Sequence, residues 1–248
     1  MKTIVEICTG SFEDVKNAQA GGADRVELNS GLFLGGLTPS LATMRRVAAE
    51  LSIPAVAMVR PRGAGFCYTA DETAIMLADA QLLLENGAAG IAFGFLTPDR
   101  RVDKGRTGEM TALIHELGGE AVFHRAFDCT VEPHAAIEAL IRLGVDRVLT
   151  SGLADKAPDG VALLRDLQRQ YGGEIQLLAG SGVNVGNARQ LMEETGICQL
   201  HSSCRHWFAD PTTHGGQVSY GYGPDPYRDC YDGVSLENVR NFVQAVKG

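Results

Sequence analysis

The feature that most constrains the fold of this chain is a regular alternation of short apolar runs with amphipathic stretches, from one end to the other. The apolar runs that have the length and composition of buried strands are Thr3–Cys8, Arg25–Asn29, Ala55–Arg60, Gly90–Phe95, Ala121–Arg125, Arg147–Ser151, Gln176–Ala179 and Gln199–Ser202. The amphipathic stretches are Ser11–Ala20, Ser40–Leu51, Ala70–Asn86, Thr107–Leu117, Pro133–Leu143, Asp159–Tyr171, Asn184–Thr195 and Ser235–Val246. Glycine follows several of these stretches, where a left-handed residue would end a helix and lead into the next strand. The pattern therefore predicts repeated strand–helix units.

Eight strands alternating with eight helices within 248 residues predict a (β/α)8 TIM barrel, an α/β fold of this size. An open doubly wound sheet is the alternative. Such a sheet usually has fewer units and a glycine-rich phosphate turn after its first strand, and no such turn follows residue 8. We find no linker or composition shift, so residues 1–248 are expected to form a single domain.

One segment, residues 206–233, departs from the alternation. It is rich in glycine and proline and contains four tyrosines, Tyr220, Tyr222, Tyr227 and Tyr231. A long connection of this kind inside a compact domain is usually functional, disordered or part of a subunit contact. We expect an irregular loop that serves as a subunit contact or as a lid over the site.

Composition excludes several classes of partner. The formal net charge is −8, which argues against a nucleic-acid or acidic-membrane partner. No apolar run approaches the roughly 18 residues that a membrane-spanning helix needs. Six cysteines are scattered without a CxxC pair, which is typical of reduced thiols and not of a disulfide framework or a structural zinc site. The expected location is therefore the cytoplasm.

Polar side chains recur at the ends of the predicted strands. Because strand residues two apart point to the same face, four strands carry polar pairs in phase. These pairs are Glu6 with Cys8, Glu27 with Asn29, Arg60 with Arg62 and, if the backbone stays extended, His124 with Asp128. The alternative is a merely polar rim. Since barrel enzymes keep their sites at the carboxyl ends of the strands, we expect these side chains to converge at that mouth.

Turns rich in glycine or serine stand at the ends of the last three predicted strands, at residues 150–152, 180–183 and 201–203. Backbone amides in such turns often bind phosphate in barrels, although these glycines could serve only tight turns. We expect a small anionic ligand, with substrate-binding residues Arg60, Arg62, Tyr68, Arg125, Ser151, Gly180, Ser181, Gly182, His201 and Ser202.

If the chain is an enzyme, its acid or base belongs to the group Glu6, Glu27, His124 and Asp128. His124 is the expected proton shuttle, because the ordinary pKa of histidine is near neutrality. Asp128 is expected to orient His124 or to pair with Arg125. Nucleophilic catalysis by Cys8 is not favoured, since the neighbouring Glu6 would raise the pKa of its thiol.

Several segments together resemble the CutC family: VEIC (5–8), GADRVEL (22–28), GGLTPS (35–40), VRPRGAGFCY (59–68), FHRAFD (123–128), RVLTSG (147–152), GSGV (180–183) and LHSS (200–203). The resemblance covers nearly the whole chain. It implies a cytoplasmic TIM barrel that assembles as a homodimer or a larger homo-oligomer. It also implies a role in copper homeostasis, with copper bound through cysteines near the first two strand ends, and it implies no established reaction.

The sequence departs from the family's pattern at one of those two positions. Cys8 is present as a candidate metal ligand, but Asn29 stands where many members have a second cysteine. A soft Cu(I) ion prefers thiolates, so we expect no high-affinity Cu(I) site built from one chain. No cofactor other than copper is indicated. Three functions remain open: a copper-handling protein, an acid–base enzyme acting on a small phosphorylated or carboxylated metabolite, and a binding or scaffold protein.

Overall fold

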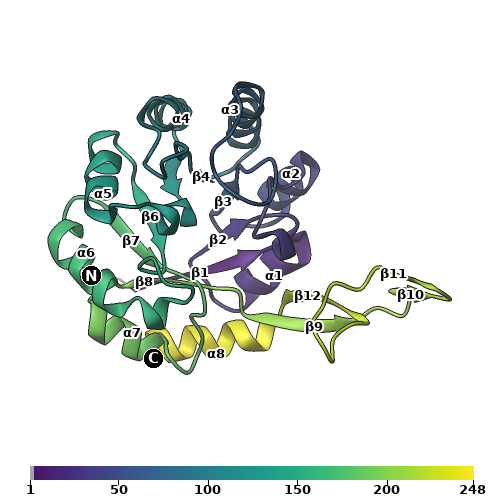
Figure 1. Ribbon diagram of the computed structural model, residues 1–248. Helices are drawn as coiled ribbons and strands as arrows, with labels where there is room; N and C mark the ends of the chain where they lie inside the picture. Colours follow the sequence, from purple (N-terminus) through teal and green to yellow (C-terminus); the bar gives the residue numbers. More distant parts are fainter. Residues whose placement is uncertain (1–2) are drawn as a thin grey trace.

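The computed structural model describes residues 3–248, which form a closed barrel of eight parallel strands surrounded by helices (Figure 1). The strands pair in chain order, and β1 closes the barrel against β8. The barrel strands are β1 Ile4–Thr9, β2 Arg25–Leu28, β3 Ala55–Met58, β4 Gly90–Phe93, β5 Glu120–Phe123, β6 Arg147–Thr150, β7 Gln176–Ala179 and β8 Gln199–Ser202. The predicted (β/α)8 fold is confirmed; residues 1–2 of the predicted domain lie outside the described residues.

The helices alternate with the strands, and α1, α2, α3, α4 and α8 begin where a side chain caps them. They are α1 Phe12–Ala20, α2 Leu41–Glu50, α3 Ala70–Glu85, α4 Lys104–Glu116, α5 Pro133–Arg142, α6 Val161–Tyr171, α7 Ala188–Thr195 and α8 Leu236–Lys247. The first three begin after Ser11, Ser40 and Thr69, whose hydroxyls accept a hydrogen bond from an N–H in the first turn. Short 3-10 helices η1 (Leu32–Leu34), η2 (Arg125–Cys129) and η3 (Ala157–Asp159) lie in the loops after β2, β5 and β6.

The barrel interior is divided into an apolar half and a polar half. Alternate strand residues point inward, and on β3, β4 and β5 these are Val56, Met58, Ala92 and Val122, which form a buried apolar cluster of their own. On β1, β2 and β8 the same inward phase carries ionisable side chains that are also buried. A charged side chain inside a protein needs a partner. The ionisable side chains of β1, β2 and β8 therefore mark one place where a site is to be sought.

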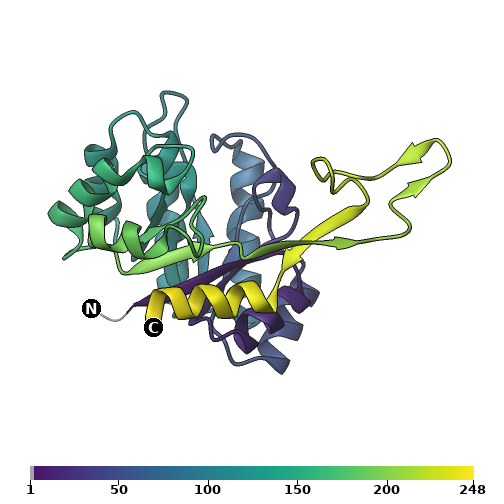
Figure 2. The ribbon, with the colours of Figure 1, turned by 90° about the horizontal axis from the view of Figure 1, so that it is seen from below.

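The segment between β8 and α8 is an arm that projects from the barrel (Figures 1 and 2). Strands β9 (Arg205–Ala209) and β12 (Cys230–Val234) pair antiparallel along its base, and the short strands β10 (His214–Gly215) and β11 (Val218–Ser219) form a hairpin further along the chain. The sequence-based prediction of an irregular loop was therefore wrong for much of this segment. Its strands pair with one another and not with a barrel strand.

The search of residues 3–248 found no helix with the length and apolar character needed to span a bilayer.

Candidate functional site

A compact group of potential ligands lies at the barrel positions of β1, β2 and β8. Cys8, Glu27 and His201 each offer one ligand atom, and these atoms all lie within 4.8 Å of one another. The strand register explains the grouping, because Cys8 pairs with Glu27 across β1 and β2. The Cys8 thiol donates to Glu27 Oε2 at 3.8 Å. We call these three residues the Cys8 cluster.

Glu6 and Arg25, which lie next to the Cys8 cluster inside the barrel, hold His201 in place. His201 Nδ1 lies 2.8 Å from Glu6 Oε1, and Arg25 Nε donates to the other oxygen of Glu6. Register dictates this chain of contacts, since Glu6 stands opposite Arg25 on β2 and opposite His201 on β8. Glu6 was predicted to be a catalytic residue at the mouth; instead it is buried inside the barrel and its carboxylate is fully engaged. Arg25 was not predicted, although a charged residue in the inward phase of a strand is a signal that could have revealed it.

The ionisable side chains of this group have pKa values that differ strongly from their ordinary values. Burial raises the pKa of Glu6, but the Arg25 charge and the hydrogen bond to His201 outweigh it and hold that pKa at about 2. Burial lowers the pKa of His201, yet hydrogen bonds to Cys8 and Glu6 raise it well above its ordinary value. For Cys8 and Glu27 burial dominates, so both have a raised pKa. At neutral pH the group therefore contains a charged imidazole between Glu6 and a protonated thiol.

Such an arrangement is chemically suited to a metal ion. A ligating histidine typically donates its second ring N–H to a carboxylate, and Glu6 receives that hydrogen bond here. Thiolate and imidazole are ligands that copper accepts, and the carboxylate of Glu27 adds a third donor. Sequence reasoning had named these residues individually, but it assigned His201 to an anion site.

Asn29 lies beside the Cys8 cluster. Its amide Nδ2 donates to Glu27 Oε2 at 3.0 Å and approaches Cys8 Sγ at 3.7 Å. An amide nitrogen is a donor and cannot replace a thiolate as a ligand. The asparagine therefore hydrogen-bonds two of the candidate ligands and leaves Cys8 as the one thiol of the group.

A second group of polar side chains lies at the ends of β3 and β5, apart from the Cys8 cluster. Arg60 is buried, and its terminal nitrogens donate to the carbonyl oxygens of Leu34, Gly36 and Ala64. It thereby ties together the loops that follow β2 and β3. The buried phenol ring of Tyr68 lies in the same loop region.

His124 belongs to this second group, and the predicted role of proton shuttle does not suit it. Its side chain is 3% exposed, and Nδ1 accepts a hydrogen bond from the N–H of Ala126 at 3.1 Å. Burial and the charge of Arg60 lower the pKa of His124 to about 3, so the imidazole is neutral at any physiological pH. Gly94 makes room for this ring, because a Cβ at that position would lie 2.6 Å from His124 Cε1.

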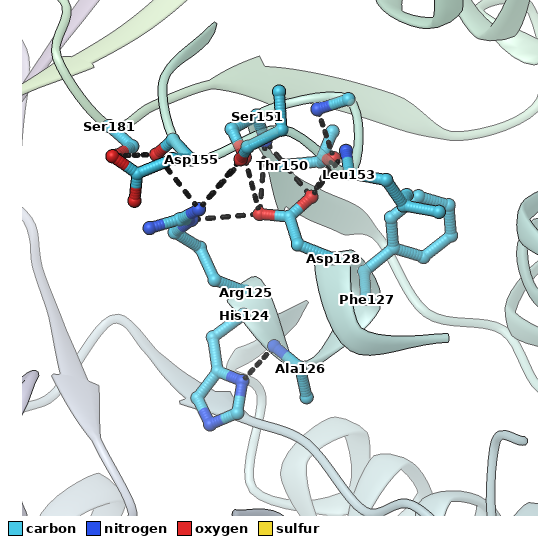
Figure 3. Close-up of polar contacts among 12 residues, drawn as sticks. His124, Arg125, Ala126, Phe127, Asp128, Thr150, Ser151, Leu153, Asp155 and Ser181 are labelled. Atoms are coloured by element: carbon cyan, nitrogen blue, oxygen red, sulfur yellow. Dashed lines mark hydrogen bonds and ion pairs between the residues drawn. The ribbon is translucent and has the colours of Figure 1, made fainter. Parts of the chain in front are cut away.

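Asp128 does not approach His124 (Figure 3). The extended backbone that would have put both on one face ends at His124, where η2 begins and turns Asp128 toward the end of β6. There its carboxylate accepts hydrogen bonds from the Thr150 hydroxyl at 2.5 Å and from the N–H and hydroxyl of Ser151. Arg125 pairs with Asp128, as one of the two alternatives predicted, at 2.8 Å. These residues lock the loop after β6, so Asp128, Arg125 and Ser151 serve the structure of that loop.

The predicted role of Arg62 is also not supported by its position. Its guanidinium pairs with Glu72 of α3 at 2.6 Å and donates to carbonyl oxygens of its own loop. The side chain is 41% exposed, and its guanidinium carbon lies 5.0 Å from the ring centroid of Tyr68. The charge of Arg62 is used to fasten the loop after β3 to the start of α3.

Around residues 180–183, where an anion site was predicted, several polar groups already have partners within the chain. The N–H of Gly180 and the hydroxyls of Ser181 and Ser202 each donate to a backbone carbonyl, at 3.1, 2.7 and 2.8 Å. Gly182 has a φ of +72° that serves the turn, and it packs against Lys156. Neither predicted arginine reaches this loop, because β3 lies four strands away from β7 in the barrel.

Comparison with protein-family models gives a match to the CutC family over residues 3–206. The chain belongs to the CutC family. The family protein CutC of Treponema denticola is 40% identical over 248 residues, which cover 99% of this chain and all of that one. The human copper homeostasis protein cutC homolog is 41% identical over 202 residues, or 82% of this chain and 73% of that one.

Solved structures agree with this CutC assignment. The crystal structure of CutC from Streptococcus agalactiae has a TM-score of 0.76 at 27% identity and covers 81% of this chain and 98% of that chain. Phosphoribosylanthranilate isomerase from Thermotoga maritima has a TM-score of 0.58 at 14% identity, with 99% of both chains covered, a likeness that shows the barrel fold alone. The CutC family match ends at residue 206, so nearly all of the arm lies beyond it.

Proposed function

We propose that this chain is a copper-handling protein that binds one copper ion at the Cys8 cluster. The observation that carries the proposal is the approach of a thiol, an imidazole and a carboxylate to within 4.8 Å of one another inside a barrel of the CutC family. The names of relatives such as the human copper homeostasis protein cutC homolog point to the same metal.

The donor set fits copper better than it fits hard cations. Mg²⁺ and Ca²⁺ take oxygen ligands, whereas the Cys8 cluster offers one sulfur, one nitrogen and one carboxylate. Cys8 and His201 would be the principal ligands of Cu(I), and Glu6 would hold the imidazole in position from behind. With a single thiolate, the affinity should stay below that of a site with two cysteines.

Copper must displace protons to bind here. Because burial raises the pKa of Cys8 and hydrogen bonds raise that of His201, both ligands carry a proton at neutral pH. Metal binding therefore releases protons, and the apparent affinity should increase from pH 6 to pH 8.

Competition titration of Cu(I) against a chromogenic chelator tests this proposal. We expect one copper per chain in the unaltered protein, no copper retained by Cys8→Ser, and unchanged binding by Cys67→Ser, which makes the same change at an exposed thiol of the β3–α3 loop. Asn29→Cys should raise the affinity by about tenfold or more, because it supplies a second thiolate next to Cys8. Equal copper binding by Cys8→Ser and the unaltered protein would exclude this site.

An acid–base enzyme is the weaker candidate. The three carboxylates and the histidine named for that role are divided between separate groups, and His124 has a pKa of about 3. We further propose a cytoplasmic location, supported by six cysteines without a CxxC pair, and self-association, supported by the exposed tyrosines of the arm.

A further inference from the structure

One buried arginine in the described chain has no counter-ion. Three arginines are less than one tenth exposed: Arg25, Arg60 and Arg147. Arg25 pairs with Glu6, and Arg147 pairs with Glu120 at 2.8 Å. Arg60, at 5% exposure, has no carboxylate within 4.0 Å anywhere in residues 3–248, and its guanidinium donates to neutral carbonyl oxygens. A buried guanidinium without a balancing charge is unfavourable, and an anion would correct it.

Three buried polar atoms in the same region have no hydrogen-bond partner. They are Arg60 Nε, the Tyr68 hydroxyl and His124 Nε2. The Nδ1 atom of His124 accepts from the Ala126 N–H, so the proton of the neutral ring resides on Nε2. All three atoms can therefore donate. Buried donors are almost always satisfied in folded proteins, and three unsatisfied ones together indicate a missing acceptor.

Tyr68 is a neighbour of Arg60, since burial raises the pKa of its phenol and the Arg60 charge opposes that rise. Phe66 connects Arg60 with His124. Its ring centroid lies 5.0 Å from that of His124 and 5.2 Å from the guanidinium carbon of Arg60. The ring belongs to the loop 61–69 after β3, which the structure holds closed by a hydrogen bond from Arg60 to the Ala64 carbonyl at 2.6 Å. The apolar interior cluster of β3, β4 and β5 lies in the same half of the barrel, whereas the Cys8 cluster belongs to β1, β2 and β8.

We propose that Arg60, Tyr68 and His124 form a binding site for a small oxyanion, a carboxylate or a phosphate, closed by Phe66. Arg60 supplies the positive charge, and the two neutral donors fix the orientation of the anion's oxygens. The loop 61–69 swings outward to admit the ligand and returns over it. This site is separate from the Cys8 cluster and does not depend on copper.

Thermal unfolding in matched ionic strengths of sodium chloride, sodium acetate and sodium phosphate tests the site. We expect acetate or phosphate to raise the melting temperature above its value in chloride, and the two salts distinguish a carboxylate from a phosphate ligand. Titration calorimetry with the more effective anion then gives its affinity. Tyr68→Phe, which removes one oxygen atom and leaves the packing unchanged, should weaken that affinity about tenfold or more.

Tyr171→Phe is the matched control, because it makes the same change at a tyrosine on α6 whose hydroxyl bonds Glu138 on the outer surface. It should bind the anion as the unaltered protein does, and so should Cys8→Ser. His124→Phe provides an independent second variant and should lose affinity as Tyr68→Phe does. The proposal is overturned if neither anion stabilises the protein relative to chloride, or if Tyr68→Phe binds as tightly as Tyr171→Phe.

Discussion

At the scale of single residues, two buried histidines in one barrel have opposite electrostatic surroundings. His201 contacts the carboxylate of Glu6 and is favoured in its charged form. His124 lies beside the cation Arg60, has no carboxylate partner, and is held neutral. His201 can therefore ligate a metal ion only after it loses a proton, whereas the neutral ring of His124 can donate a hydrogen bond to an anion.

The two imidazoles should differ in an NMR titration of their ring nitrogens between pH 5 and pH 8. We expect His124 to remain neutral, with its proton on Nε2, over the whole range, because its pKa is about 3 in the folded protein. His201 should be charged at pH 7, because its pKa is raised. A His124 resonance that titrates near pH 6.5 would contradict this account.

The pKa shifts of His124 and His201 make the stability of the fold depend on pH in opposite directions. The folded pKa of His124 lies below the ordinary value of 6.5, so its contribution is present above pH 6.5 and decreases as pH falls toward 3. The contribution of His201, whose folded pKa is raised, is present below pH 6.5 and is lost as pH rises through that raised pKa. Between pH 6 and pH 5, the free energy of unfolding should therefore fall faster in the unaltered protein than in His124→Phe. The two proteins should differ in this fall by up to about 1.4 kcal/mol per pH unit.

At the scale of secondary-structure elements, helix α1 anchors the base of the arm. The Asp14 carboxylate accepts from the N–H of Val234 in β12 at 2.7 Å and from the N–H of Gly10 at 2.9 Å. Asn17, one turn further along α1, donates to the carbonyl oxygen of Val234 at 3.0 Å. The two hydrogen bonds to Val234 join residues more than two hundred positions apart in the chain.

Asp14→Ala should lower the free energy of unfolding by about 2–3 kcal/mol, because it leaves one buried and one partly buried N–H group without their charged acceptor. Glu13→Ala is the control, since the neighbouring carboxylate is exposed and pairs only with Lys16. Urea denaturation of both variants measures the difference. Equal midpoints for the two would show that the anchor does not contribute to stability.

At the scale of the whole molecule, the arm projects from the barrel as a distinct part of the structure (Figure 2). The barrel core is continuous, whereas the arm carries exposed aromatic and apolar side chains, among them Tyr220 at 82% and Val218 at 57% exposure. Exposed apolar groups that gather on one projection often mark a contact with another protein. This distribution is what supports self-association through the arm.

Removal of residues 211–219, which contain the β10–β11 hairpin, should leave the melting temperature nearly unchanged, because β10 and β11 pair with each other and with no barrel strand. Light scattering coupled to gel filtration should then report a smaller assembly than the homodimer or larger oligomer expected of the unaltered chain. An identical mass for both proteins would place any subunit contact elsewhere.

The sequence by itself determined the order and approximate bounds of the barrel elements, because apolar periodicity and helix-ending glycines are local properties of the chain. It also identified Cys8, Glu27 and His201 as polar strand residues. Only the tertiary structure brought these three together, since closure of the barrel makes β8 the neighbour of β1. Likewise, the turn at η2 that separates Asp128 from His124, the pairing of Arg62 with Glu72 and the isolation of Arg60 depend on where distant loops meet. Strand phase can be read from neighbours in sequence, whereas the register between strands and the partner of each buried charge are set by contacts between distant segments.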